Sequence, residues 1–196
     1  MKKGLMSFSL GILLVSSVLA QEETLMGGEL SHGGFGGPVL KITQINEELG
    51  LLTGGRGAWI VGHMITIGGG GYTLINDIEV TSVADAPNLR FEYGGFEMGF
   101  IIASDKLLHF SVNSLFGTGT VGHRWGEGDG DWDAADTDHF FVLEPSANVI
   151  VNVAKFFRIG LGASYRYVTG VDDFGDISDA DLSGVSAVVT LKFGSF

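Results

Sequence analysis

Apolar and polar side chains alternate along residues 139–169, HFFVLEPSANVIVNVAKFFRIGLGASYRYVT. Apolar residues take the odd positions over 141–153 and again over 157–167, whereas most even positions are polar or glycine. Side chains on a β-strand point to opposite faces in turn, so each half has one apolar and one polar face. The pattern therefore predicts two long amphipathic strands joined by a tight turn at Lys155.

Pairing positions whose numbers sum to 310 places odd residues opposite odd residues, so the two strands share one apolar face. A soluble sandwich has strands of about five to six residues on average. The predicted strands are about twice that length. Long strands with a polar reverse face are typical of a wall between lipid and a filled lumen.

The same alternation predicts eight strands along the chain. They cover Gly37–Ile45, Glu48–Val61, Met64–Ile75, Arg90–Ala103, Leu107–Gly122, His139–Val153, Phe157–Thr169 and Leu182–Phe193. In the third strand, Gly68 to Gly71 blur the alternation, and no faces are assigned there. Strong coiling, or bulky lumen side chains packed against bare backbone, would explain the glycines.

Connections between the predicted strands alternate in length. Asn76–Leu89, His123–Asp138 and Gly170–Asp181 are long, whereas the connections between them are short. The first connection, near Asn46, is the exception, because it is short where the alternation calls for a long one. Alternation places the long connections at one end, which is the layout of up-and-down barrels. The predicted fold class is therefore all-β: an eight-stranded, antiparallel, up-and-down transmembrane β-barrel.

The N-terminus has the pattern of a secretion signal. Two lysines precede a mainly apolar segment over 5–19, and Ala20 ends a small-residue site that predicts cleavage before Gln21. A membrane anchor helix is the alternative, but the apolar segment is short for one. The predicted organisation is a signal peptide over 1–20, a flexible glycine-rich leader over 21–36 and an outer-membrane barrel over 37–196. A lumen plug or a strand fragment is the alternative for the leader.

Composition narrows the function. The chain has no cysteine, which excludes disulfides and thiolate chemistry. Its net charge of −12 argues against nucleic acid, which is bound by neutralising phosphates. Of its 23 acidic residues, 14 lie in the three long connections, so charge gathers at one end of the predicted barrel.

Charged residues also occur at inward positions of the strands. An eight-stranded barrel is just wide enough for its own side chains, so these charges must neutralise one another. Glu144 and Arg166 are opposite each other in the hairpin register and are predicted to form a cross-strand ion pair. The predicted lumen ion-pair network is Lys41, Arg56, Glu97, Glu144, Arg158, Arg166 and Lys192. A structural filling is favoured over the alternative, a gate on a narrow conduit.

The connection over 126–138 contains one partial metal motif. Asp129, Asp131 and Asp133 have the 1-3-5 spacing of a calcium loop. The sixth position, however, is Ala134 rather than glycine, and the twelfth is phenylalanine rather than glutamate. A solvated acidic loop is favoured, with weak calcium binding as the alternative. No other cofactor is expected.

Catalysis finds little support in the sequence. His109 and Ser111 resemble the His-x-Ser element of barrel-type lipid A deacylases, but they lie inward near a short turn, and no carboxylate follows at similar depth. No G-x-S-x-G element or phosphate-binding loop is present. The prediction is a protein that is not an enzyme. Aromatic residues expected in interface girdles are Trp59, Tyr93, Trp125, Trp132, Tyr165 and Tyr167. For Trp125 and Trp132, which lie in a long connection, stacking on a ligand and packing of the loops are the alternatives.

The features that carry a family resemblance are the signal end Val18-Leu19-Ala20, the eight amphipathic strands, the alternating connections and the closing run VSAVVTLKFGSF with Phe196. Through them the chain resembles the small outer-membrane β-barrels of the OmpA, OmpX and OmpW kind. The resemblance implies an outer-membrane location, contact with membrane lipid and with the barrel-assembly machinery, and a monomer. The leading hypothesis is a non-enzymatic barrel with a side-chain-filled lumen and acidic extracellular loops for surface structure or interaction. The alternatives are a narrow transporter or channel for small, including hydrophobic, solutes, and a soluble secreted ligand-binding barrel.

Overall fold

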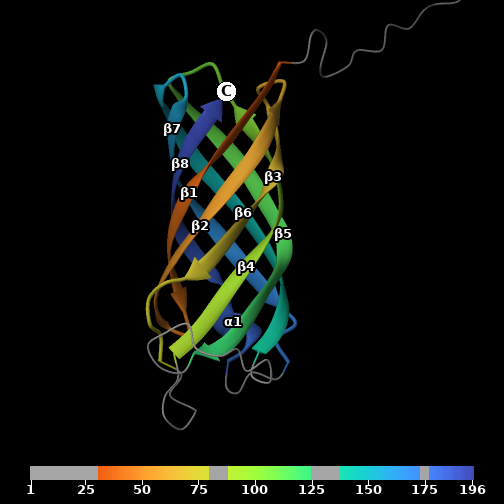
Figure 1. The fold of residues 1–196 in the computed structure, drawn as a ribbon, viewed down its shortest axis with the longest axis vertical. Helices are drawn as coiled ribbons and strands as arrows, with labels where there is room; N and C mark the ends of the chain where they lie inside the picture. The colour runs from red at the N-terminus through yellow and green to blue at the C-terminus, as the bar shows by residue number, and fades with distance from the viewer. Residues whose placement is uncertain (1–30, 80–87, 125–136, 173–176) are drawn as a thin grey trace, which may run out of the picture.

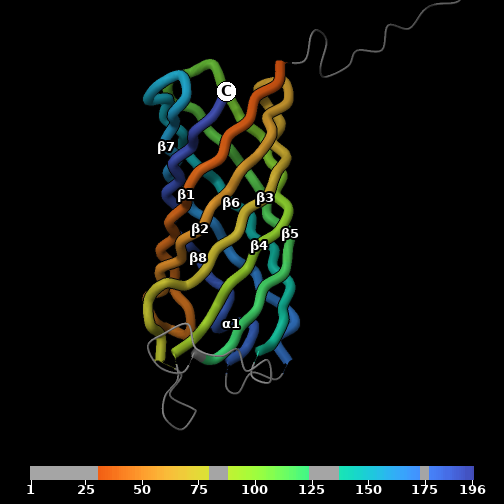
Figure 2. Tube along the Cα trace, in the orientation of Figure 1, coloured from red at the N-terminus to blue at the C-terminus, as the bar shows by residue number. Residues whose placement is uncertain are grey.

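The computed structural model describes residues 31–79, 88–124, 137–172 and 177–196. The predicted signal peptide, and the predicted leader up to residue 30, lie outside the described residues. Eight antiparallel strands follow one another around a closed barrel, in which the first also pairs with the last (Figures 1 and 2). They are β1 (His32–Ile45), β2 (Glu48–Val61), β3 (Ile65–Leu74), β4 (Asn88–Ile102), β5 (Leu108–Arg124), β6 (Thr137–Ala154), β7 (Phe157–Thr169) and β8 (Gly184–Ser195). The predicted fold class is confirmed.

The strand ends that the three long connections join lie at one end of the barrel, here called the long-loop end (Figure 1). The short turns after β2, β4 and β6 lie at the other end, the short-turn end. The tight turn between β1 and β2 is also at the long-loop end, where the sequence departs from the alternation. Asn46 and Glu47 form it with φ angles of 49° and 64°. Positive φ at both turn residues fits the right-handed twist of a two-residue hairpin.

The connection from β7 to β8 contains α1 (Asp179–Leu182) at the long-loop end. The backbone N–H of Asn46 donates to the carbonyl of Asp181 over 2.9 Å, which ties this connection to the first turn. In the part of the chain that the structure describes, no helix is long and apolar enough to span a membrane.

The predicted hairpin register is confirmed. Phe141 pairs with Thr169 and Ser146 with Ser164, as the sum of 310 requires. Close to the turn the register shifts between Asn152 and Ala154, where β6 contains a bulge.

Alternation in the sequence corresponds to alternation in space. The apolar residues of one phase point out of the barrel, as Phe100 and Phe110 do with 54% and 51% of their surfaces exposed. Trp59, Tyr165 and Tyr167 share this outward face. Tyr93, which was also expected in a girdle, is buried in the lumen instead, because its neighbours on β4 fix it in the inward phase. Trp125 and Trp132 lie outside the described residues.

The first strand begins earlier than predicted. Residues His32–Gly36, expected to belong to the leader, pair with β2 along their whole length, and Gly34–Gly36 pair with β8 as well. Backbone hydrogen bonds need no side chains, so a glycine-rich segment completes the barrel without showing any alternation.

The glycines of β3 make room inside the barrel. A Cβ atom at Gly70 would lie 3.0 Å from the Tyr72 hydroxyl and 3.3 Å from Cβ of Arg56. Both of those side chains are buried in the lumen. This supports the expectation that bulky lumen side chains pack against bare backbone.

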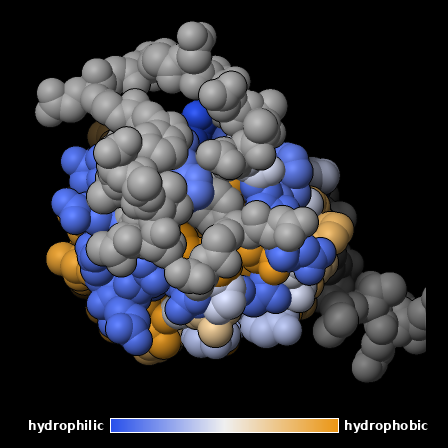
Figure 3. Space-filling model, turned by 90° about the horizontal axis from the view of Figure 1, so that it is seen from below, coloured by the Kyte–Doolittle hydropathy of each residue, from blue (hydrophilic) through white to orange (hydrophobic). Residues whose placement is uncertain are grey.

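Side chains fill the lumen. A large apolar cluster, including Ile78, Phe91, Phe140 and Leu182, occupies the part nearer the long-loop end. A smaller cluster contains Phe35, Ile60 and Ile101. The long-loop end seen from outside carries hydrophilic residues around its rim, with apolar residues on the flanks (Figure 3). Among the residues that the structure describes, the lumen therefore contains a packed core.

Candidate functional site

The seven residues of the predicted lumen network all take inward phases of their strands. Six are buried, with at most 7% of their surface exposed: Lys41, Arg56, Glu97, Glu144, Arg166 and Lys192. Arg158, near the short-turn end, is half-buried. What the sequence did not give is how these charges are partnered.

Glu144 is the centre of the best-connected cluster. Its Oε1 and Oε2 atoms lie 2.8 Å and 2.7 Å from Nζ of Lys41. The hydroxyl of Tyr93 donates to Oε2 over 2.8 Å, and Oγ of Ser164 donates to Oε1 over 2.6 Å. Nζ of Lys41 also lies 3.3 Å from the ring centroid of Tyr72. A buried charge pair needs such additional partners to offset its desolvation.

The predicted ion pair between Glu144 and Arg166 is wrong. Arg166 donates from Nε to the carbonyl of Leu182 over 2.7 Å, and its guanidinium lies 4.9 Å from the ring centroid of Phe91. The register does place Glu144 and Arg166 on neighbouring strands in the same phase. Lys41 takes the carboxylate instead because barrel closure brings β1 across the lumen toward β6, which a two-strand argument does not include.

Arg56 and Glu97 form the second ion pair, through Nη2 and Oε1, with both side chains almost completely buried. They come from β2 and β4, with β3 between them. Because Gly70 lies opposite Arg56 and Gly68 lies opposite Glu97, no side chain from β3 separates the two.

The remaining cations toward the short-turn end lie over aromatic rings. Nζ of Lys192 is 4.5 Å from the ring centroid of Phe35, and the guanidinium of Arg158 is 3.9 Å from that of Phe196. Cations are attracted to the negative face of an aromatic ring. The network thus resolves into two ion pairs and three cations held by rings or by a carbonyl.

His109 and Ser111 serve this packing. Nδ1 of His109 lies 3.3 Å from the carbonyl of Lys106, and its Nε2 lies 3.5 Å from Nη1 of Arg158. The amide of Asn113 donates to Oγ of Ser111 over 3.3 Å. These contacts hold the end of the lumen together and do not resemble a nucleophile with its base.

The cavity between the two ion pairs is small. A cavity of about 20 Å³ is lined by residues that include both ion pairs and Tyr72. A buried water needs about 10–15 Å³, so the cavity has room for about one water molecule. A hydrated solute does not fit there.

The metal hypothesis concerns Asp129, Asp131 and Asp133, which lie outside the described residues. Over the described ranges, no three histidine or acidic side chains are grouped closely enough to hold a metal ion.

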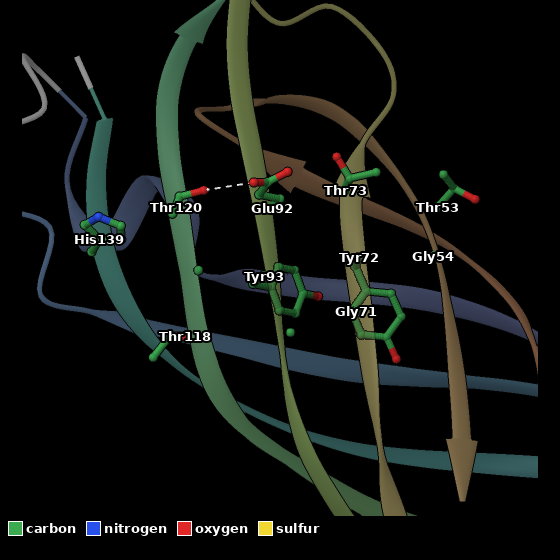
Figure 4. Close-up of a pocket in the computed structure, with 12 residues that line it drawn as sticks. Thr53, Gly54, Gly71, Tyr72, Thr73, Glu92, Tyr93, Thr118, Thr120 and His139 are labelled. Carbon is green, nitrogen blue, oxygen red and sulfur yellow. Dashed lines mark hydrogen bonds between the residues drawn. The ribbon is translucent and has the colours of Figure 1, made fainter. Parts of the chain in front are cut away.

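A second site, missed by the sequence reasoning, lies on the outer wall. A hollow of about 710 Å³ is open on β2–β6 toward the long-loop end. Five outward polar residues follow one another across these strands, as Figure 4 shows: Thr53, Thr73, Glu92, Thr120 and His139. We call them the polar row. The sequence signal was limited to single strands: Glu92, Thr120 and His139 are polar residues at positions that share a phase with the apolar residues of their strands.

Comparisons support the fold. Neisserial surface protein A has a TM-score of 0.59 at 8% identity, covering 85% of this chain and 99% of that chain. Ail, the attachment invasion locus protein of Yersinia pestis, has a TM-score of 0.50 at 11% identity, covering 83% of this chain and 97% of that chain.

No protein-family model matches the sequence, and no curated protein matches it. At such low identities the likeness concerns the fold alone. The chain has the fold of the small eight-stranded outer-membrane β-barrels.

Proposed function

We propose that this protein is a non-enzymatic β-barrel of the bacterial outer membrane that serves surface structure or interaction. The observation that carries the proposal is the orientation of the wall: apolar side chains such as Phe100 and Phe110 point outward, and the ion pairs point inward. A charged side chain on the lipid face would cost about 2–4 kcal/mol at the midplane. A soluble ligand-binding barrel would present polar side chains outward instead.

A structural or surface role is favoured over transport because the cavity that both ion pairs line has a volume of only about 20 Å³. The acidic connections at the long-loop end are the natural contact surface for ions, envelope sugars or partner proteins. Barrel closure pairs every strand edge, as a strand in lipid requires, so the proposed form is a monomer. Membrane lipid and the barrel-assembly machinery are the partners that this location implies.

Electrophoresis of unboiled and boiled membrane samples tests the location and the fold together. We expect a compact band in outer-membrane fractions that shifts on boiling. Release of the protein into detergent-free buffer would contradict the proposal.

Planar bilayer recording tests the filled lumen. We expect no sustained conductance from the purified protein. Stable channels would show that the lumen opens, and they would favour the transporter instead.

A further inference from the structure

The polar row is one continuous line of paired positions. Thr53 pairs with Thr73, Thr73 with Glu92, Glu92 with Thr120, and Thr120 with His139. Directly opposite positions of this kind bring Cβ atoms to about 5 Å of each other. The five side chains therefore present hydroxyl, carboxylate and imidazole groups along one edge of the hollow.

Glycines form the floor beside the polar row. The next line of outward positions toward the short-turn end contains Gly55, Gly71 and Gly94, which pair in that order, and it continues at Thr118 on β5. Gly71, Gly94 and Thr118 line the hollow. Since the glycines lack side chains, the wall is recessed there, next to the polar groups. The recess and the polar edge together make the hollow.

Apolar residues flank the row on the β2–β3 side of the hollow. Leu49 and Ile75, closer to the long-loop end, are 64% and 52% exposed and point outward. On the opposite side, Phe96 and Phe116 continue the apolar wall. On β4 and β6 the next outward positions toward the long-loop end are Arg90 and Thr137. The row therefore lies at the polar border of the apolar wall, the level at which lipid headgroups meet a barrel.

The carboxylate of Glu92 has two partners, a neighbouring cation and a hydroxyl of the row. Nη2 of Arg90 lies 3.2 Å from Oε2 of Glu92, and the hydroxyl of Thr120 donates to Oε1 over 3.3 Å. A carboxylate has about four acceptor positions, so Glu92 is held in place with acceptor capacity left for a ligand. A phosphate would meet this carboxylate, whereas a neutral polyol would donate to it and bond to the threonine hydroxyls.

We propose that the hollow binds the neutral sugar headgroup of a membrane glycolipid, with the sugar on the polar row and the lipid body along the glycine floor. The continuity of the hollow with the apolar wall favours a lipid-borne sugar over a free one. This inference rests on the proposed membrane location. It adds a lipid-binding site on the wall, separate from the loops.

Native mass spectrometry of the barrel in nanodiscs tests the site. The nanodiscs contain phosphatidylcholine with equal small amounts of monogalactosyl diacylglycerol and phosphatidylglycerol. We expect retention of the galactolipid over phosphatidylglycerol, and retention that is not competed by soluble methyl galactoside. Thr73→Val and Glu92→Gln should each weaken retention about five-fold, the effect of losing one hydrogen bond. Thr169→Val, an outward threonine of β7, is the matched control and should leave retention unchanged.

Preferential retention of phosphatidylglycerol, or equal retention of both lipids, overturns the sugar assignment. Full competition by methyl galactoside shows a site for free sugar and overturns the lipid-borne occupant. Equal retention by Thr73→Val, Glu92→Gln and Thr169→Val places the lipid elsewhere. A heat-modifiable barrel in the same nanodiscs separates these failures from a failure of the proposed membrane fold.

Discussion

At the residue scale, the lumen shows how barrel closure decides which charges meet. Lys41 and Glu144 are separated by 103 positions in the chain, yet they form the most completely bonded pair of the lumen. Inward phase was predictable for both from alternation on their own strands. Their partnership was not, because it depends on the diameter and tilt of the closed barrel, whereas strand register relates adjacent strands only.

Replacing Lys41 tests how much the ion pair with Glu144 contributes to the free energy of unfolding. Lys41→Met leaves a buried carboxylate without its cation, and removing one partner of such a pair costs about 3–5 kcal/mol. We expect a correspondingly lower free energy of unfolding, measured by urea titration in lipid vesicles. The control is Lys106→Met. Lys106 lies in the exposed turn after β4, and its ion pair with Asp105 is in contact with solvent. Loss of stability no larger than in the control would contradict this account of the lumen.

Gly70 gives a second test at this scale. Gly70→Ala places a methyl group 3.0 Å from the Tyr72 hydroxyl and 3.3 Å from Cβ of Arg56, which forces lumen side chains to move. Overpacking of this kind costs about 1–3 kcal/mol. Gly36→Ala is the matched control, because its Cβ would have its nearest neighbour at 4.0 Å. Equal unfolding free energies for the two variants would show that the glycine is not needed for packing.

At the element scale, the alternation of apolar and polar side chains predicted the strands that show it, and it missed the glycine-rich start of β1, which does not. The bounds of β2 and β7 follow directly from the pattern. The start of β1 does not, because His32–Gly36 form part of the sheet through backbone hydrogen bonds that glycine supplies as well as any residue. The short helix α1 was also missed, since its contacts come from a strand and a turn distant in sequence.

Arg166 is expected to hold α1 in place. Arg166→Met removes the donor to the carbonyl of Leu182, and a hydrogen bond from a charged group is worth about 1.5–3 kcal/mol. Amide hydrogen exchange at Ser183 and Asn46, whose N–H groups donate within this connection, should become about ten-fold faster or more. Tyr167→Phe, an outward change on the same strand, is the control. Unchanged exchange at both amides would mean that α1 is held by its apolar contacts alone.

At the scale of the whole molecule, the strand count, the direction of the apolar face and the grouping of long connections all followed from sequence. They depend on periodicity and on spacing, which are local. The polar row did not follow, because it runs across five strands and no single strand shows it. Sites that cross a sheet perpendicular to its strands require the register of every pair involved, whereas the pattern of the sequence supplied the register of the β6–β7 hairpin only.

Charge is also organised over the whole molecule, with cations in excess among the predicted lumen residues and acids concentrated in the long connections. Calcium titration distinguishes a specific metal site in the acidic connections from a diffuse attraction of cations to their negative charge. The 126–138 segment lacks the glycine and the bidentate glutamate of a calcium loop. We therefore predict that calcium changes the tryptophan fluorescence only weakly, that magnesium has the same effect, and that added salt screens it. The measurement is a titration of tryptophan fluorescence with each ion. The comparison is a variant in which Asp129, Asp131 and Asp133 are all changed to Asn. A saturable response to calcium alone that the triple variant loses would establish the specific site instead.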